Sequence, residues 1–204
     1  MQFSSLLLSL SSVLAATVPI SGAPPNPNQV YIKEITYGGT GCPANTVAIA
    51  MSEDRTTFTL IFDQFVASSG PGTTVTDFRK NCQVNVDLRY PSGFSYSIAQ
   101  VDYRGYVNVP AGLTATQKSN YYFSGQQNQI SAQSVFTGPY TKDYLVSDKI
   151  EIAKYVWSPC GSVARGNVNA QVRLEGNTSL AGQITVDSID GKVKQTFGII
   201  WKTC

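Results

Sequence analysis

The sequence predicts an all-β protein: a single antiparallel β-sandwich held by two disulfides. Three observations lead to this prediction. Apolar and polar residues alternate with a period of two along many short stretches, which is typical of half-buried strands. Turn-forming residues recur at short intervals, and no segment keeps a 3.6-residue apolar period over three turns. Four cysteines are an even number, as expected for two disulfides in an exported chain.

Residues 1–16 are predicted to be a signal peptide. The apolar and small residues between Phe3 and Leu14 form a run too short to span a bilayer, and Ala15 and Ala16 follow it. Only the α-amino group supplies the positive charge expected before such a run, and cleavage after Ala23 is an alternative. No second apolar stretch of membrane length follows. We therefore expect a secreted, extracellular protein that is not bound to a membrane.

Residues 17–29 are predicted to be a flexible lead-in, because the segment GAPPNPN is rich in proline and asparagine. Residues 30–204 form the predicted sandwich domain. Its clearest alternating stretches are residues 57–62, 83–90, 94–98, 169–174 and 183–186. Asp190-Gly191 is the expected centre of a hairpin turn. Residues 113–129 are the least regular and are expected to hold long loops or edge strands. A distorted barrel is the alternative to two packed sheets.

Alternation also predicts the core, because it selects one face of each strand. The residues expected to be buried are Phe58, Leu60, Phe62, Val84, Val86, Leu88, Val172, Leu174, Ile184, Val186 and Trp201. Trp157 and Trp201 each precede a cysteine by three residues, in WSPC and WKTC. We expect both indoles to pack near one disulfide, and exposure as ligand platforms is the alternative.

The cysteines are Cys42, Cys82, Cys160 and Cys204, and three connectivities are possible. We predict the sequence-local pairs, Cys42–Cys82 and Cys160–Cys204. Each would stabilise the fold by about 4 kcal/mol in the loop-entropy description of disulfides.

Composition excludes several classes of function. Only 14% of residues are charged and the net charge is +2, with no dense basic cluster, so we expect no nucleic-acid partner. The chain has no histidine, which excludes Ser-His-Asp and Cys-His hydrolases and His-ligated metal sites. Two disulfides would leave no thiolate. We therefore expect no enzyme, no cofactor and no metal.

Carboxylates are the remaining route to catalysis, because a glycosidase needs two that face each other. Asp63, Asp87 and Asp102 lie in or beside predicted strands. Sequence spacing specifies no convergence, so we expect them to be solvent-facing strand residues.

Tyrosines gather in the middle of the chain, and they suggest a binding surface because Tyr and Arg supply much of the energy of protein interfaces. The predicted binding residues are Tyr103, Arg104, Tyr106, Tyr121, Tyr122, Tyr140 and Tyr144. The alternative for any one tyrosine is that its ring packs inward. Asn177 heads the single N-glycosylation sequon and is expected in a solvent-facing turn.

Several motifs occur in a fixed order between Thr40 and Cys204: YGGTGCP, SGPGTTVTDFRKNCQ, the YRGY segment, FTGPY, VWSPCG and WKTC. In these the chain resembles a domain-of-unknown-function family of small secreted proteins, common in filamentous fungi and present in bacteria. The resemblance implies secretion and brings no established catalytic residues.

The resemblance also implies a context, since some secreted fungal proteins of this type look like extracellular effectors that act on plant defence proteins. We expect a monomeric virulence effector whose partner is a host protein; the specific expectation is a leucine-rich-repeat polygalacturonase inhibitor. A cell-wall or carbohydrate-binding module is the alternative, and a carboxylate-based carbohydrate-active enzyme is a third. Exposed coplanar aromatics would favour a carbohydrate module, whereas a mixed Tyr/Arg/Asn patch would favour a protein partner.

Overall fold

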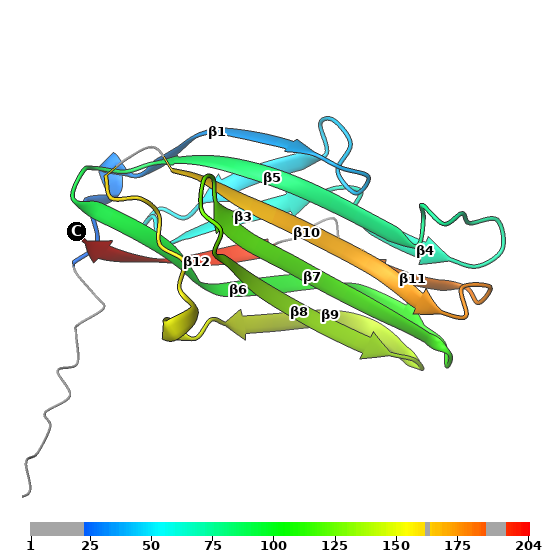
Figure 1. Ribbon diagram of the computed structural model, residues 1–204. Coiled ribbons are helices and arrows are strands. Elements are labelled where there is room, and N and C mark those ends of the chain that lie inside the picture. Colours follow the sequence, from blue (N-terminus) through cyan, green and yellow to red (C-terminus); the bar gives the residue numbers. More distant parts are fainter. Residues whose placement is uncertain (1–22, 162–163, 187–194) are drawn as a thin grey trace, which may run out of the picture.

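A computed structural model describes residues 23–161, 164–186 and 195–204 of the chain. Two antiparallel sheets pack face to face (Figure 1). The order of the first is β1-β5-β10-β7-β8, with bounds β1 (Tyr31–Gly38), β5 (Arg79–Arg89), β10 (Ala164–Gly176), β7 (Leu113–Phe123) and β8 (Gln129–Thr137). We call it the five-stranded sheet. The predicted fold class is confirmed.

The second, seven-stranded sheet has the order β2-β3-β12-β6-β11-β4, and β9 pairs with β6. Its strands are β2 (Val47–Met51), β3 (Thr57–Phe62), β12 (Gln195–Thr203), β6 (Phe94–Val109), β11 (Gly182–Thr185), β4 (Val66–Ser69) and β9 (Tyr140–Lys149). Residues 100–103 of β6 pair with both β12 and β9, so these two strands flank β6 on opposite sides. β8 and β9 consequently lie at the same open edge of the sandwich (Figure 1).

The core lies between the sheets, and all eleven residues predicted for it are buried. Phe58 of β3 stacks on Phe197 of β12 with ring centroids 4.4 Å apart, and Tyr121 of β7 meets the same Phe197 ring edge-on from the other sheet. Period-two alternation identified these positions because each strand presents one face to the opposite sheet.

The expectation of loops or edge strands was wrong for residues 113–123. Residues 113–123 form β7, which pairs with β10 on one side and β8 on the other. Its inward positions include Ala115, Gln117 and Ser119, all buried. Small and polar inward residues hid the alternation that apolar ones would have shown.

The end of the expected lead-in has local structure. Pro27–Gln29 form a short 3-10 helix, η1, in which the Asn26 side chain accepts a hydrogen bond from the Asn28 N–H. Proline suits this first position because it has no N–H to leave unpaired. A second short 3-10 helix, η2 (Ile152–Lys154), follows β9. The signal-peptide segment and the predicted Asp190-Gly191 hairpin lie outside the described residues.

Both disulfides have the predicted pairing, Cys42–Cys82 and Cys160–Cys204. The first joins the loop after β1 to β5, and both of its cysteines are buried. The second joins the segment after η2 to the end of β12.

Candidate functional site

The seven predicted binding residues do not form one surface. Tyr103, Tyr121 and Tyr144 are buried, with 1%, 3% and 4% of their surfaces exposed, so their assignment to a binding surface is corrected. The cause is the phase of each strand: Tyr103 shares the inward face of β6 with Val101 and Val107.

These three tyrosines use their hydroxyls inside the molecule. The Tyr103 and Tyr121 hydroxyls are hydrogen-bonded across the two sheets, 2.5 Å apart, and the Tyr144 hydroxyl donates to the Thr185 carbonyl at 2.8 Å. Burial raises the pKa of all three phenols above the usual value for tyrosine. They therefore stay neutral under physiological conditions. The Tyr103–Tyr121 bond links the two sheets, whereas the Tyr144 bond lies within the seven-stranded sheet.

Further polar side chains surround this pair in the interior. Gln195 of β12 donates to the Ser119 hydroxyl at 3.4 Å, and Gln117 lies two residues before Ser119 on the same inward face of β7. Both glutamine side chains are almost fully buried. Removing these groups from water has a cost that hydrogen bonds offset only in part, because both polar atoms of the Gln117 side chain and the Gln195 Oε1 have no partner among the described residues.

Tyr140 is half-buried near the open edge of the sandwich. The centroids of the Tyr140 and Phe136 rings are 5.3 Å apart. The Lys142 ammonium lies 5.3 Å from the centroid of the Tyr140 ring. Tyr122 is also partly buried, but it lies on the outer face of the five-stranded sheet. Neither residue shares a surface with the other predicted residues.

Arg104 and Tyr106 remain, on the outer face of β6, and β9 completes a surface around them. In the register of the two strands, Arg104 pairs with Leu145 and Tyr106 with Asp143. We define the β6–β9 face as Asp102, Arg104, Tyr106, Asn108, Thr141, Asp143, Leu145 and Ser147. It combines a cation, an aromatic ring, carboxylates and a leucine on one face of a sheet.

Leu145 is the most informative member of this face, because 75% of its surface is exposed. An exposed leucine beside Arg104 and Tyr106 offers an apolar contact within a polar rim, as in protein interfaces. The sequence analysis did not name Leu145. Its exposure follows from the phase of β9, because Leu145 lies one residue after Tyr144, which the structure shows to be buried. The sequence-based prediction placed Tyr144 on the surface and so had the opposite phase.

Hydrogen bonds fix the ends of the β6–β9 face. Ser147 donates to the Asp102 carboxylate at 2.5 Å, Gln100 donates to the same carboxylate, and Thr141 donates to Asn108 at 2.9 Å. Between Arg104 and Tyr106, Gly105 has no room for a side chain: a Cβ there would lie 2.1 Å from the Thr185 carbonyl oxygen. The face is therefore built on a rigid, closely packed support.

The three carboxylates considered from the sequence, Asp63, Asp87 and Asp102, lie on different elements. Asp87 of the five-stranded sheet is 6% exposed, not solvent-facing, and its carboxylate forms two contacts with the Arg89 guanidinium, at 2.7 and 2.9 Å. Asp102 lies in the other sheet and Asp63 follows β3. Within the described residues, no group of three Asp, Glu, Cys or His could hold a metal ion.

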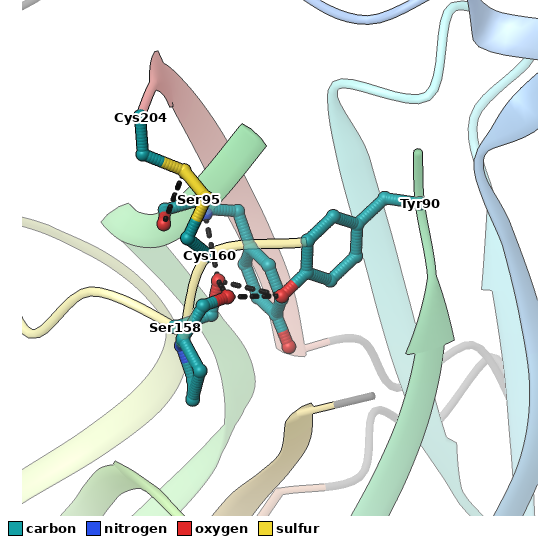
Figure 2. The surroundings of a disulfide bond; sticks show 7 residues. Tyr90, Ser95, Ser158, Cys160 and Cys204 are labelled. Carbon is teal, nitrogen blue, oxygen red and sulfur yellow. Dashed lines mark hydrogen bonds between the residues drawn. A yellow bond between two sulfur atoms is a disulfide. The ribbon is translucent and has the colours of Figure 1, made fainter. Parts of the chain in front are cut away.

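The Cys160–Cys204 disulfide lies near Tyr90, Ser95 and Ser158 (Figure 2). Tyr90 donates to Ser158, whose hydroxyl also accepts from the Tyr96 N–H. Trp201 is buried against Tyr90 and Tyr96, as predicted. Trp157 is only half-buried, with the Lys202 ammonium 4.5 Å from its ring centroid, so the two indoles have different roles.

A cleft of about 570 Å³ lies at the open edge between β8 and the residues after β9. Asp148 is among its lining residues, and burial raises the pKa of that carboxyl.

Asn177 lies in the exposed turn between β10 and β11, as expected, and its side chain accepts a hydrogen bond from the Ser179 N–H. In the described part of the chain, no helix has the length and apolarity needed to cross a membrane.

Comparison with known proteins identifies the family of this chain. Residues 28–204 match the family described as "Domain of unknown function (DUF4360)". The chain belongs to the DUF4360 family. It is also 48% identical over 184 residues to a protein of Arthroderma benhamiae described as an "Uncharacterized secreted protein", covering 90% of this chain and 75% of the relative. Together with the two disulfides, this relationship shows that this DUF4360 protein is secreted.

Among solved structures, the DUF4360 chain is similar to the enzymatically active domain of bacteriophage CBA120 tailspike protein 4. Sequence identity is 15% and the TM-score is 0.23, and the match covers 88% of this chain and 20% of that one. A TM-score this low supports no conclusion about function.

Proposed function

We propose that this secreted protein is a non-catalytic binding protein that engages an extracellular host protein through the β6–β9 face. The observation that carries the proposal is Leu145, exposed on a rigid sheet next to Arg104 and Tyr106. An apolar centre flanked by Arg and Tyr is the arrangement in which a few residues contribute most of the binding energy.

The proposal that the protein is not an enzyme rests on chemistry. The chain has no histidine, and all four cysteines are in disulfides. The three carboxylates considered as candidates lie on separate elements, and Asp87 is already paired with Arg89. These observations support a non-catalytic role, because they remove the histidine and thiolate chemistry on which many hydrolases depend.

The finer proposal concerns the partner. The resemblance to fungal effectors favours a plant leucine-rich-repeat polygalacturonase inhibitor, so that binding would release the fungus's own pectin-degrading enzymes. The mixed composition of the β6–β9 face supports a protein partner. Of the large apolar side chains that are most exposed in the described residues, Tyr31 alone is aromatic, which favours a protein partner over stacked sugars.

Binding of the purified mature protein to a purified leucine-rich-repeat inhibitor tests the proposal. We expect Leu145→Ser to weaken binding by about thirtyfold, which corresponds to about 2 kcal/mol at an interface centre. The matched control is Val135→Ser, because Val135 is 54% exposed on β8 of the other sheet. Equal affinities of the two folded variants would reject the β6–β9 face.

Two further results would reject other parts of the proposal. If the parent protein does not bind the inhibitor but captures another host protein in a Leu145-dependent manner, the partner is wrong and the face is right. Release of reducing sugars from pectin, glucan or chitin, abolished by one Asp→Asn or Glu→Gln substitution, would show that the protein is an enzyme.

A further inference from the structure

The outer face of the five-stranded sheet contains a second hollow, of about 380 Å³. We call it the basic trough. Its lining comes from four neighbouring strands and includes Arg79 of β5, Gln171 and Arg173 of β10, Lys118 and Asn120 of β7, and Gln133 of β8. Four strands at the usual spacing span about 14 Å. The trough is therefore wide enough for a ligand larger than a single small ion.

The positive charges of the trough are brought together by the strand register. Arg79 lies directly opposite Arg173, and Lys118 pairs with Gln171 on the next rung. Like charges placed directly opposite on neighbouring strands destabilise a sheet. Such a local conflict, held in a rigid sheet, is expected where a function requires it.

The partners of these cations within the protein leave the positive charge largely uncompensated. The Arg79 Nε donates to the neutral Gln171 side chain at 2.8 Å. Arg173 contacts the Glu175 carboxylate at 2.9 Å, and both of these side chains are well exposed, so the pair is weak. Among the described residues, no carboxylate lines the trough itself. In the described residues, the three cations Arg79, Lys118 and Arg173 thus have one acidic neighbour, Glu175.

The polar atoms at the base of the trough are also incompletely paired. The Nε of Arg173 and the Oδ1 of Asn120 have no hydrogen-bond partner within the protein. A buried donor or acceptor without a partner destabilises the fold. A ligand carrying both acceptors and donors could pair with these atoms after a small movement of the side chains.

The remaining lining identifies the class of ligand. Asparagine and glutamine side chains both donate and accept hydrogen bonds, which suits the hydroxyl groups of sugars. Arginine matches a carboxylate through two parallel N–H bonds. The described residues that line the trough include no aromatic residue on which bases would stack and no large apolar residue to anchor a protein. We propose that the basic trough binds an acidic polysaccharide, a polymer of sugar units carrying carboxylates.

Binding of a uronic-acid tetrasaccharide, tetragalacturonate, to the purified mature protein tests this inference by calorimetry at low salt. We expect its methyl ester, which keeps the sugar rings and loses the charge, to bind at least tenfold more weakly. Raising the ionic strength should weaken binding of the acid, because exposed charges are screened. Equal binding of the acid and the ester, or no binding of the acid, would overturn the proposal.

Two charge-neutralising variants locate the site. Lys118→Gln and Arg79→Gln should each reduce affinity for the acid about tenfold, as expected for loss of a charge-assisted hydrogen bond. The control is Lys149→Gln, because Lys149 is exposed on β9 of the other sheet and gives the same change in net charge. Melting temperatures establish that all three variants fold. If Lys149→Gln weakens binding as much as Lys118→Gln, the effect is general electrostatics and the site is rejected.

A sulfated tetrasaccharide and a short single-stranded oligonucleotide complete the test. Tighter binding of either one than of tetragalacturonate would show a general polyanion site and overturn the assignment to carboxylated sugars. The inference does not depend on the β6–β9 face, because Leu145→Ser should leave binding of the tetrasaccharide unchanged.

Discussion

Strand β6 carries Tyr103 and Arg104 as neighbours in the sequence, and the two residues belong to different environments. Tyr103 is 1% exposed and its hydroxyl bonds to Tyr121 of the opposite sheet, whereas Arg104 lies on the outer face with Tyr106 and Leu145. The inner face of β6 holds the sandwich together. The outer face is the surface proposed for a partner. The contrast shows that tyrosine abundance indicates an interface only after the phase of each strand is known.

Truncation of Tyr103 should produce the largest effect on this comparison. Tyr103→Ala removes a buried ring and the hydrogen-bond partner of Tyr121, so we expect the free energy of unfolding to fall by about 3–5 kcal/mol. Tyr103→Phe, which removes only the hydroxyl, should cost about 1–2 kcal/mol. Denaturant unfolding measures both. A loss below 1 kcal/mol for Tyr103→Ala would contradict the burial of this ring.

High pH should destabilise the inner face. Burial raises the pKa of Tyr103, Tyr121 and Tyr144 in the folded protein above the ordinary value of 10.0, so these phenols keep their protons where an unfolded chain loses them. Their contribution is complete below pH 10 and is lost as the pH rises, by up to about 1.4 kcal/mol per pH unit for each tyrosine.

Unfolding in denaturant between pH 8 and pH 11 measures this loss. We expect Tyr144→Phe to make the unfolding free energy depend less steeply on pH above pH 10, by the amount that corresponds to one titrating proton. An unfolding free energy that stays constant up to pH 11 would show that the hydroxyls titrate in the folded protein and are not enclosed.

The smallest effect is expected on the outer face. Tyr106→Ala should change the free energy of unfolding by less than about 0.5 kcal/mol, because surface substitutions remove few contacts. The same variant should weaken binding to the leucine-rich-repeat partner. The two measurements together separate a binding residue from a core residue, since a loss of several kcal/mol in stability would place Tyr106 with Tyr103.

Much of the fold was accessible from the sequence. Strand β3 has the predicted bounds, the eleven core residues are buried, and both disulfides pair as expected. These features depend on local alternation and on sequence-local cysteines. Strand β7 was missed because Gln117 and Ser119 face inward, which no local rule anticipates.

The candidate site was less accessible for a different reason. A tyrosine has an apolar ring and a polar hydroxyl, so it suits both the core and the surface. Only the pairing of β6 with β9 shows that Leu145 stands beside Arg104. The basic trough likewise depends on the register of strands that are far apart in the chain, such as Arg79 opposite Arg173.

The position of β12 has a consequence for the kinetics of folding. It is the last of the described strands in chain order, yet it lies between β3 and β6, where Gln195 pairs with Leu60 on one side and with Tyr103 on the other. Pairings between residues so distant in sequence slow folding, typically to milliseconds or seconds. Until residues 195–203 leave the ribosome, β3 and β6 have unpaired apolar edges that favour aggregation. We therefore expect a chain that lacks residues 195–203 to aggregate more readily than the whole domain.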